Sequence, residues 1–308
     1  MLLDGGFRVV APDMLGYGDS ARLPDAPGVP PESIRVYAYK NVADDIRELA
    51  RQLECTTIIL GGHDWYYSLA PFLPSSPARS SLVNDRGAQV AWRVAQWHPS
   101  LVSRLFTIAG PYRRPTSHWT SFDDLVKAVP QLAYQKQIAS GILEQTFCTT
   151  EGIRDFLKIL DFSGDAQNQT AFEPTRGFDL EHLQRLGKGS LLTDQELEVY
   201  VAKYSRNGLH GPCNWYRTRR ANFEDDQSLL GSTIDIPVLY IAAARDRVFS
   251  PSLTHDMEQC VPQLLRASVD AHHYAHVEKW QDVNGILSAW LRAEFHGSAS
   301  LVARTSLA

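Results

Sequence analysis

The chain has 308 residues, of which 44% are hydrophobic and 21% are charged. This composition is typical of a soluble globular protein and excludes a disordered, collagen-like or membrane-embedded chain. Thirty Lys and Arg face 35 Asp and Glu, a formal net charge of −5 without a long block of like charge, so we expect no nucleic-acid partner.

The cysteines and the apolar runs indicate the compartment. The four cysteines form no C-x-x-C pair, which favours reduced intracellular thiols over a disulfide framework or a zinc site. The longest apolar run, Val238–Ala244, has seven residues, far fewer than the roughly 20 that span a bilayer. Asp4 follows Met1-Leu2-Leu3 directly, so we expect no signal peptide. These features predict a cytoplasmic protein without a membrane span.

Short β-rich runs alternate with helical patterns at both ends of the chain. The predicted strands are Phe7–Ala11, Thr56–Leu60, Arg104–Ala109, Pro237–Ala244 and Leu265–Asp270. Between the first two, Val42, Ile46, Leu49 and Leu53 recur at helical spacing among polar residues, which predicts an amphipathic helix. Alternating strands and helices predict an α/β fold, a mostly parallel sheet with helices on both faces.

The middle of the chain breaks this alternation. Helical patterns dominate it, at Ile142–Phe147, Ile153–Leu160 and Asp194–Tyr204, and no strand is predicted there. We therefore expect residues 113–230 to form a helical cap. Residues 1–112 and 231–296 would form the α/β core, interrupted by an atypical insert at 66–86, and residues 297–308 would form a C-terminal tail.

A glycine-rich turn follows the first predicted strand. Gly16–Ala21 matches the pattern G-x-G-x-x-A of dinucleotide-binding proteins. That function needs a helix to start at the turn, so that its amides can hold the pyrophosphate. Four prolines follow instead, at positions 24, 27, 30 and 31, which argues against a dinucleotide site.

The pentapeptide GGHDW (Gly61–Trp65) follows the second predicted strand. A turn in which small residues flank a nucleophile raises one side chain above the end of a sheet, beside a helix N-terminus. Here that residue is Asp64, whose carboxylate can attack carbon and leave an ester on the enzyme. The alternative is a glycine-rich turn in which an aspartate caps a helix.

Two residues near later strands favour the catalytic alternative. Asp246 lies just past Arg245 at the end of the strand Pro237–Ala244, and His273 follows the last predicted strand by three positions. The chain order of nucleophile, acid and histidine matches that of the α/β-hydrolases, with Asp in place of Ser. His272 and His276 are four apart but lack a third ligand, so a metal site is disfavoured.

Five segments occur in order along the chain: PDMLGYGDS (Pro12–Ser20), GGHDW (Gly61–Trp65), AWRVAQWHP (Ala91–Pro99), GPCNWYR (Gly211–Arg217) and HYAHVEKW (His273–Trp280). Together they resemble the signatures of the soluble epoxide hydrolases of the α/β-hydrolase superfamily. The resemblance runs from about Gly6 to Leu291, except for residues 66–86. It implies an α/β-hydrolase fold with a cap, an epoxide and water as substrates, and neither a metal nor an organic cofactor.

The resemblance also implies roles for single residues. Asp64 corresponds to the nucleophile, Asp246 to the acid that orients the histidine, His273 to the base that activates water, and Tyr216 to one of two cap tyrosines that polarise the epoxide oxygen. The backbone amide of Trp65 would stabilise the oxyanion. The other cap tyrosine is less clear, because Gln137 stands at its usual place and Tyr134 is only nearby. Tyr134, Gln137 and Trp215 are candidate substrate-binding residues.

The sequence departs from the family pattern at its beginning. The family starts with further strands and an H-G-x-P loop that completes the oxyanion hole, whereas Met1 here stands just before the strand Phe7–Ala11. A sheet without these strands would expose an edge and apolar faces. We therefore expect low stability or aggregation.

The second departure is the 21-residue segment 66–86, which is rich in Ser and Pro. The turn requires a small residue two positions after the nucleophile, where this chain has Tyr66. Removing 66–86 would join Trp65 to Gly87 and keep the reading frame, which suggests a translated intron. The alternative is a genuine surface loop, and the transcript sequence across codons 65–87 distinguishes the two.

Two other functions stay open at this level. A haloalkane dehalogenase would use Asp64 for the attack and the Trp65 indole to hold the halide, although Tyr216 favours an oxygen leaving group. A catalytically impaired fragment that binds ligands is compatible with the missing oxyanion loop.

Overall fold

The structure is a computed structural model that describes residues 1–20, 34–63, 87–158, 171–186, 192–249, 253–254 and 256–296. Asp64, Trp65, the insert 66–86 and the tail 297–308 lie outside these residues. In the described part, no helix has the length and apolar character needed to cross a membrane.

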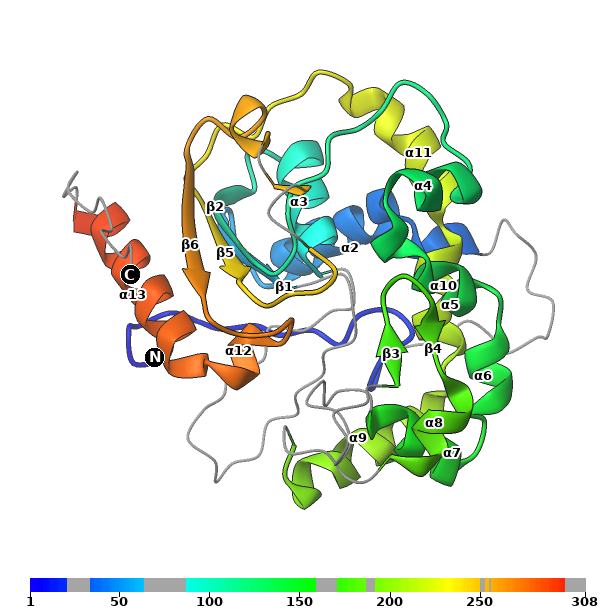
Figure 1. The fold of residues 1–308 in the computed structure, drawn as a ribbon. Helices are drawn as coiled ribbons and strands as arrows, with labels where there is room; N and C mark the ends of the chain where they lie inside the picture. Colours follow the sequence, from blue (N-terminus) through cyan, green and yellow to red (C-terminus); the bar gives the residue numbers. More distant parts are fainter. Residues whose placement is uncertain are drawn as a thin grey trace.

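A four-stranded parallel sheet forms the centre of the molecule (Figure 1). Its strands lie in the order β1 (Ile58–His63), β2 (Val102–Ile108), β5 (Val238–Ala243) and β6 (Leu264–Val269). All four were predicted from their runs of β-branched and apolar residues, with limits that differ by one to three positions. The shared direction places the carboxyl ends of all four strands at the same edge of the sheet.

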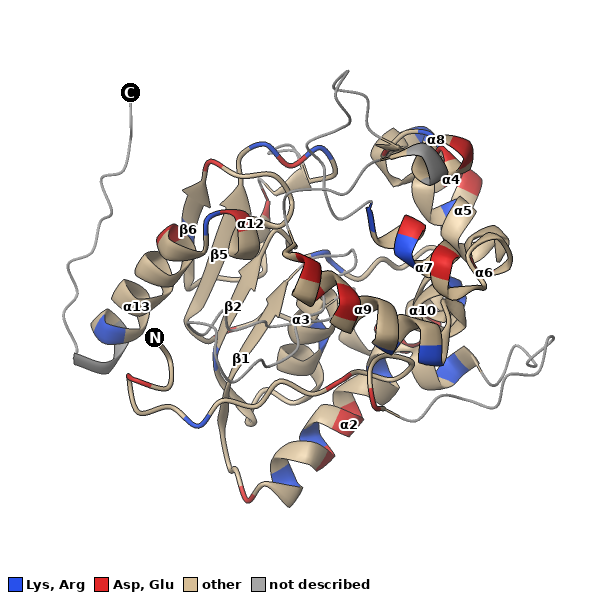
Figure 2. Ribbon diagram, turned by 90° about the horizontal axis from the view of Figure 1, so that it is seen from below, with Lys and Arg blue, Asp and Glu red and all other residues tan. Residues whose placement is uncertain are grey.

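Helices cover both faces of this sheet, as the sequence predicted. Alternate side chains of a strand point to opposite faces. Leu105 and Tyr240 pack in a core shared with α2 (Tyr39–Gln52) and α3 (Gly87–Trp97), whereas Phe106 and Leu239 pack against α13 (Trp280–His296). Figure 2 shows acidic and basic residues alternating along α2, while the sheet strands are mostly uncharged, so α2 is the amphipathic helix that the sequence predicted.

The segment Phe7–Ala11 was predicted to be a strand, and this prediction was wrong. The segment pairs with no strand of the described chain. Its composition favours β structure, but a strand also needs a neighbour that offers backbone donors and acceptors. β1 is therefore an edge strand of the described sheet.

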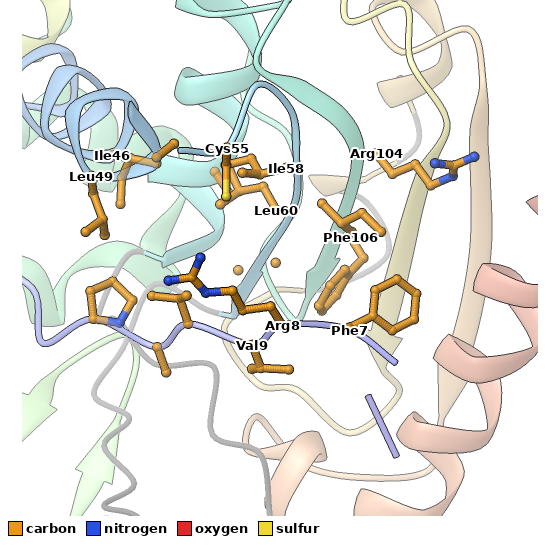
Figure 3. A pocket seen from close by; sticks show the side chains of 18 of the residues that line it. Phe7, Arg8, Val9, Ile46, Leu49, Cys55, Ile58, Leu60, Arg104 and Phe106 are labelled. Carbon is orange, nitrogen blue, oxygen red and sulfur yellow. The ribbon is translucent and has the colours of Figure 1, made fainter. Parts of the chain in front are cut away.

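An apolar cavity of about 590 Å³ lies beside β1. Figure 3 shows Ile46 and Leu49 of α2, Leu60 of β1, and Val9 along its walls.

Residues 113–230 are mainly helical. The helices of this region are α4 (Phe122–Ala128), α5 (Tyr134–Ala139), α6 (Ile142–Thr146), α7 (Thr150–Leu157), α8 (Leu180–Arg185), α9 (Asp194–Asn207), α10 (His210–Arg217) and α11 (Arg219–Asp226). Helix α9 begins with a capping box, in which Thr193 and Glu196 bond to each other's backbone N–H. A short antiparallel pair, β3 (Phe172–Glu173) and β4 (Gly177–Phe178), corrects our expectation that the region has no strand.

Three contacts attach this helical region to the sheet and its helices. Arg93 of α3 forms a bidentate, largely buried ion pair with Asp226 of α11, at 2.9 and 2.7 Å. The backbone N–H of Tyr39 donates to the Asn222 side chain, at 2.8 Å. Gly16 has a positive φ and lies so close to Gly211 that a Cβ on Gly16 would stand 2.7 Å from the Gly211 Cα. The glycine-rich turn therefore has a packing role, which accounts for Gly16 without a dinucleotide.

Candidate active site

The carboxyl ends of β1, β5 and β6 bring together residues from three distant parts of the chain. β1 ends at His63, the turn after β5 holds Asp246, and the loop after β6 holds His273. Two backbone hydrogen bonds join the last two segments, from Ala244 N to Val269 O and from Arg245 N to Ala271 O, both 2.9 Å. In open α/β sheets, ligands bind at this edge.

Asp246 and His273 form a buried pair. The Nδ1 atom of His273 lies 2.7 Å from Oδ2 of Asp246, and their side chains are 5% and 1% exposed. The other carboxylate oxygen accepts hydrogen bonds from the backbone N–H groups of Val248 (2.8 Å) and Phe249 (3.2 Å). These three contacts engage both oxygens of the carboxylate, so this aspartate is held in one orientation.

Electrostatics keep Asp246 ionised. Burial raises the pKa of its carboxyl group, but the charge and hydrogen bond of His273, together with the two backbone amides, bring the net pKa below the ordinary value of 3.8. An ionised carboxylate only accepts hydrogen bonds, so Nδ1 of His273 carries the hydrogen. The lone pair of a neutral His273 then resides on Nε2, the form required of a general base.

Two further histidines, His63 and His276, lie close to this pair. The His63 ring centroid lies 5.3 Å from that of His273 and 4.0 Å from that of His276. Burial and the neighbouring histidines lower the pKa of His63 well below 6.5, and that of His276 to about 3. Both rings are therefore neutral at pH 7. His272, which precedes His273 in the sequence, contacts the Glu278 carboxylate instead, with 3.2 Å between Nδ1 and Oε2.

Asp64 and Trp65, the predicted nucleophile and oxyanion donor, lie outside the described residues. Asp64 nevertheless follows the described His63 directly. Gly62 and His63 are buried at the end of β1, and a Cβ on Gly62 would stand 2.4 Å from the backbone oxygen of Gly87, the first residue of α3. The glycine is required for this approach of strand and helix.

The predicted cap residues lie on two helices that pack together, α5 and α10. Tyr216 and Trp215 of α10 are both buried, and the Trp215 indole N–H donates to the Leu15 carbonyl at 3.0 Å. Arg217 Nε donates to the Ala139 carbonyl of α5, also at 3.0 Å. Trp215 thereby fastens α10 to the glycine-rich turn.

Tyr134 and Gln137 both contact the β3–β4 pair. The Tyr134 ring packs edge-on against Phe172, with 5.4 Å between the centroids. The Gln137 side-chain amide makes two hydrogen bonds with the backbone of Phe178, donating at 2.9 Å and accepting at 2.6 Å. These bonds give Gln137 a structural role beside the proposed substrate-binding one.

His63 is a residue of the site to which the sequence reasoning assigned no role. In the sequence it is only the third residue of the pentapeptide GGHDW. A polar residue that ends a buried strand next to a candidate nucleophile is the signal that could have drawn attention to it. In the described part of the chain, no group of three or more His, Cys, Asp or Glu residues is arranged to hold a metal ion.

Comparisons with known proteins show the family and the fold of this chain. No protein-family model matches the chain. The epoxide hydrolase srdG of Neurospora crassa is 32% identical over 304 residues, which cover 94% of this chain and 80% of that protein. The chain belongs to the epoxide hydrolases. The bifunctional epoxide hydrolase 2 of Rattus norvegicus is 27% identical over 299 residues, and this chain spans about half (48%) of its length.

Solved structures give the same fold for this family member. VrEH2 superposes with a TM-score of 0.73 at 22% identity, covering 94% of this chain and 85% of that one. Epoxide hydrolase A of Mycobacterium thermoresistibile gives 0.65 at 24% identity, covering 90% and 80%. The α/β-hydrolase fold predicted from the sequence is therefore confirmed, with the relatives favouring an epoxide hydrolase over a dehalogenase.

Proposed function

We propose that this enzyme hydrolyses an epoxide to a vicinal diol through a covalent ester on Asp64. The observation that carries the proposal is the buried Asp246–His273 pair at the carboxyl edge of the sheet, next to the strand whose last residue precedes Asp64. A histidine whose Nδ1–H is held by a carboxylate suits the activation of water.

In the first half of the reaction, the Asp64 carboxylate attacks one ring carbon and the bond from that carbon to the epoxide oxygen breaks. Tyr216 donates a proton to the departing oxygen, so an alcohol forms as the ester forms. The burial of Tyr216 in α10 supports this role, because a hydroxyl acts more strongly on a developing charge when water is excluded.

In the second half, Nε2 of His273 takes a proton from water and the resulting hydroxide attacks the Asp64 ester carbonyl. The backbone N–H of Trp65 stabilises the tetrahedral oxyanion, a contribution of about 3 kcal/mol for a single donor of this kind. Collapse of the intermediate releases the diol and restores the Asp64 carboxylate. The proton held by His273 returns to Tyr216, so the net reaction consumes one water.

The proposal includes the domain division and the compartment. Residues 113–230 would form the cap that carries Tyr216, and residues 1–112 and 231–296 the core that carries the other three groups. Cys55, Cys148, Cys213 and Cys260 are all free thiols, which supports a reducing compartment such as the cytoplasm. Cell fractionation with an antibody against the protein tests that location.

A single turnover in ¹⁸O-labelled water tests the chemistry. With enzyme in excess over styrene oxide, we expect the label to enter the Asp64 carboxylate first, and to appear in the diol only in a second turnover. Mass spectrometry of the peptide that contains Asp64 measures the first step. Label that enters the diol directly in the first turnover would show that water attacks the epoxide itself, and would refute the ester.

A further inference from the structure

His63 connects the strand that precedes the candidate nucleophile to the candidate base. Its Nε2 atom lies 3.0 Å from the backbone carbonyl oxygen of His273, across 210 positions of sequence. His63 is fully buried, with 0% of its surface exposed. The contact therefore joins the end of β1 to the loop after β6 without competition from water.

The geometry settles which nitrogen of His63 carries the hydrogen. A carbonyl oxygen only accepts hydrogen bonds, so Nε2 must donate. Nδ1 of the neutral ring is then an acceptor, and within the described residues it has no hydrogen-bond partner. In the described part of the chain, His63 is thus held by one hydrogen bond, to the His273 carbonyl, and by ring packing against His276.

This contact constrains the main chain of His273, whereas Asp246 holds its side chain. The Asp246 carboxylate fixes the imidazole through Nδ1, at 2.7 Å. The backbone N–H of Arg245 holds the same loop two residues earlier, at the Ala271 carbonyl, but neither bond fixes the peptide of His273. The bond from His63 fixes the carbonyl of His273 itself. Because position 63 adjoins position 64, the same bond ties the peptide next to the nucleophile to the peptide of the base.

We propose that His63 is a positioning residue, a neutral imidazole whose Nε2–H holds the main chain of His273 in register with Asp64 for attack of water on the ester. This rests on the proposed function. It assigns His63 to the second half-reaction, because the nucleophilic attack by Asp64 on the epoxide does not use His273. A misplacement of about 1 Å between reacting groups is enough to cost roughly a hundredfold in rate.

Two amide substitutions that differ by one methylene test the role. The amide nitrogen of Gln can reach the place of Nε2, whereas that of Asn stops one bond short. We expect His63→Asn to lower kcat at least about tenfold without raising KM, with the ester accumulating in acid-quenched samples. His63→Gln should stay within about threefold of the parent. His272→Gln, outside the pair, is the matched control and should leave kcat unchanged.

If His63 had only a structural role, His63→Asn would lower the folded fraction but leave kcat per folded molecule and the ester level unchanged. That result would overturn the proposal. Equal loss in the Gln and Asn variants would overturn it too. A second measurement does not depend on activity: long-range ¹H–¹⁵N spectra of the histidine rings should show His63 as the Nε2–H tautomer. An Nδ1–H tautomer rejects the proposal. If the parent chain fails to hydrolyse epoxides but shows the expected tautomer and bond, the proposed function fails while the contact stands.

Discussion

The inner strand β5 and the edge strand β1 differ in how completely they are packed. Around β5, Leu239 and Ile241 are fully buried, and the following turn holds Asp246 beside His273. Around β1, Leu60 borders an apolar cavity of about 590 Å³, and the nearby segment Phe7–Ala11 pairs with no strand of the described chain. The proposed base and its acid are thus buried near the inner strand β5, while the proposed nucleophile directly follows the edge strand β1.

This difference shows that the proposed catalytic pair, Asp246 and His273, is well packed, whereas the strand that precedes the proposed nucleophile has fewer packing contacts. Parallel sheets are usually covered on both faces, and stability varies locally with the density of apolar contacts. We therefore expect substitutions near β5 to lower the catalytic rate and the global stability. Substitutions near β1 should instead disturb the elements that position Asp64.

The largest effect is expected at His273. His273→Gln removes the base but keeps a polar side chain of similar size, so kcat should fall by a factor of about 10⁴ while the ester on Asp64 accumulates. Stopped-flow kinetics and mass spectrometry of the trapped ester measure both. His272→Gln serves as the control, because His272 bonds to Glu278, and its kcat should be close to that of the parent. A His273→Gln variant that retains a tenth of the activity would contradict the role of His273 as base.

A matched pair of leucines compares the strands β5 and β1 directly. Leu239→Ala in β5 removes a side chain with no exposed surface and should lower the free energy of unfolding by about 3 kcal/mol. Leu60→Ala in β1 enlarges a cavity that already exists, so the loss should be about 1 kcal/mol. Urea denaturation at constant pH measures both. Equal losses would show that the cavity beside β1 is filled in solution.

The sequence predicted the inner strands β2 and β5 better than the region beside the edge strand β1. The runs Arg104–Ala109 and Pro237–Ala244 are long and rich in β-branched residues, which settles their conformation locally, and the chain order of Asp246 and His273 predicted their pairing. Phe7–Ala11 has a similar composition, but whether it forms a strand depends on a neighbour that composition does not reveal. The two-residue strands β3 and β4 are too short to show any periodicity.

The contact of His63 could not be predicted for a related reason. Its neighbours in sequence identify the end of a strand, but its partner is a backbone carbonyl, and every residue has one. Only the folded chain shows that the carbonyl in question belongs to His273. Similarly, the packing of Gly16 against Gly211 depends on how the helical region sits on the core, which no local pattern specifies.

The buried histidines of the site predict a dependence of stability on pH. The pKa of His276 is about 3 in the folded protein and near 6.5 in the unfolded chain, so below pH 6.5 the unfolded state binds the additional proton. Stability is therefore lost as the pH falls from 6.5 towards 3. Between pH 7.5 and 5.0 this histidine should account for about 2 kcal/mol of the loss.

His276→Gln tests this by removing the titrating group. The drop in the free energy of unfolding between the two pH values, from urea denaturation, should be smaller than in the parent by that amount. His272→Gln provides the control, because His272 lies partly exposed beside Glu278. The same drop in the His276→Gln variant and the parent would mean that His276 is not neutral in the folded state.

The smallest effect concerns the connection from the end of β1 to the start of α3, which contains Asp64. β1 ends at His63 and α3 begins at Gly87, and Gly62 lies against Gly87 and Ala88 at distances that leave no room for a Cβ. Because the strand end and the helix start are already in contact, Asp64 and Trp65 alone are long enough to join them. Deleting residues 66–86 would place Gly87 two positions after Asp64, where a small residue is required.

We expect the deletion to raise kcat/KM for an epoxide at least about tenfold, or roughly 1.4 kcal/mol of transition-state stabilisation, measured on protein of equal folded fraction. Gly87→Tyr in the deleted chain restores a bulky side chain at the critical position and should abolish the gain, which separates the effect of that position from the effect of chain length. If the deleted chain is no more active than the parent, or if Gly87→Tyr keeps the gain, the segment is a genuine part of the enzyme and the steric argument at position 66 is wrong. Because the deletion leaves Leu239 and the Asp246–His273 pair untouched, its effect should appear in the formation of the ester rather than in its hydrolysis.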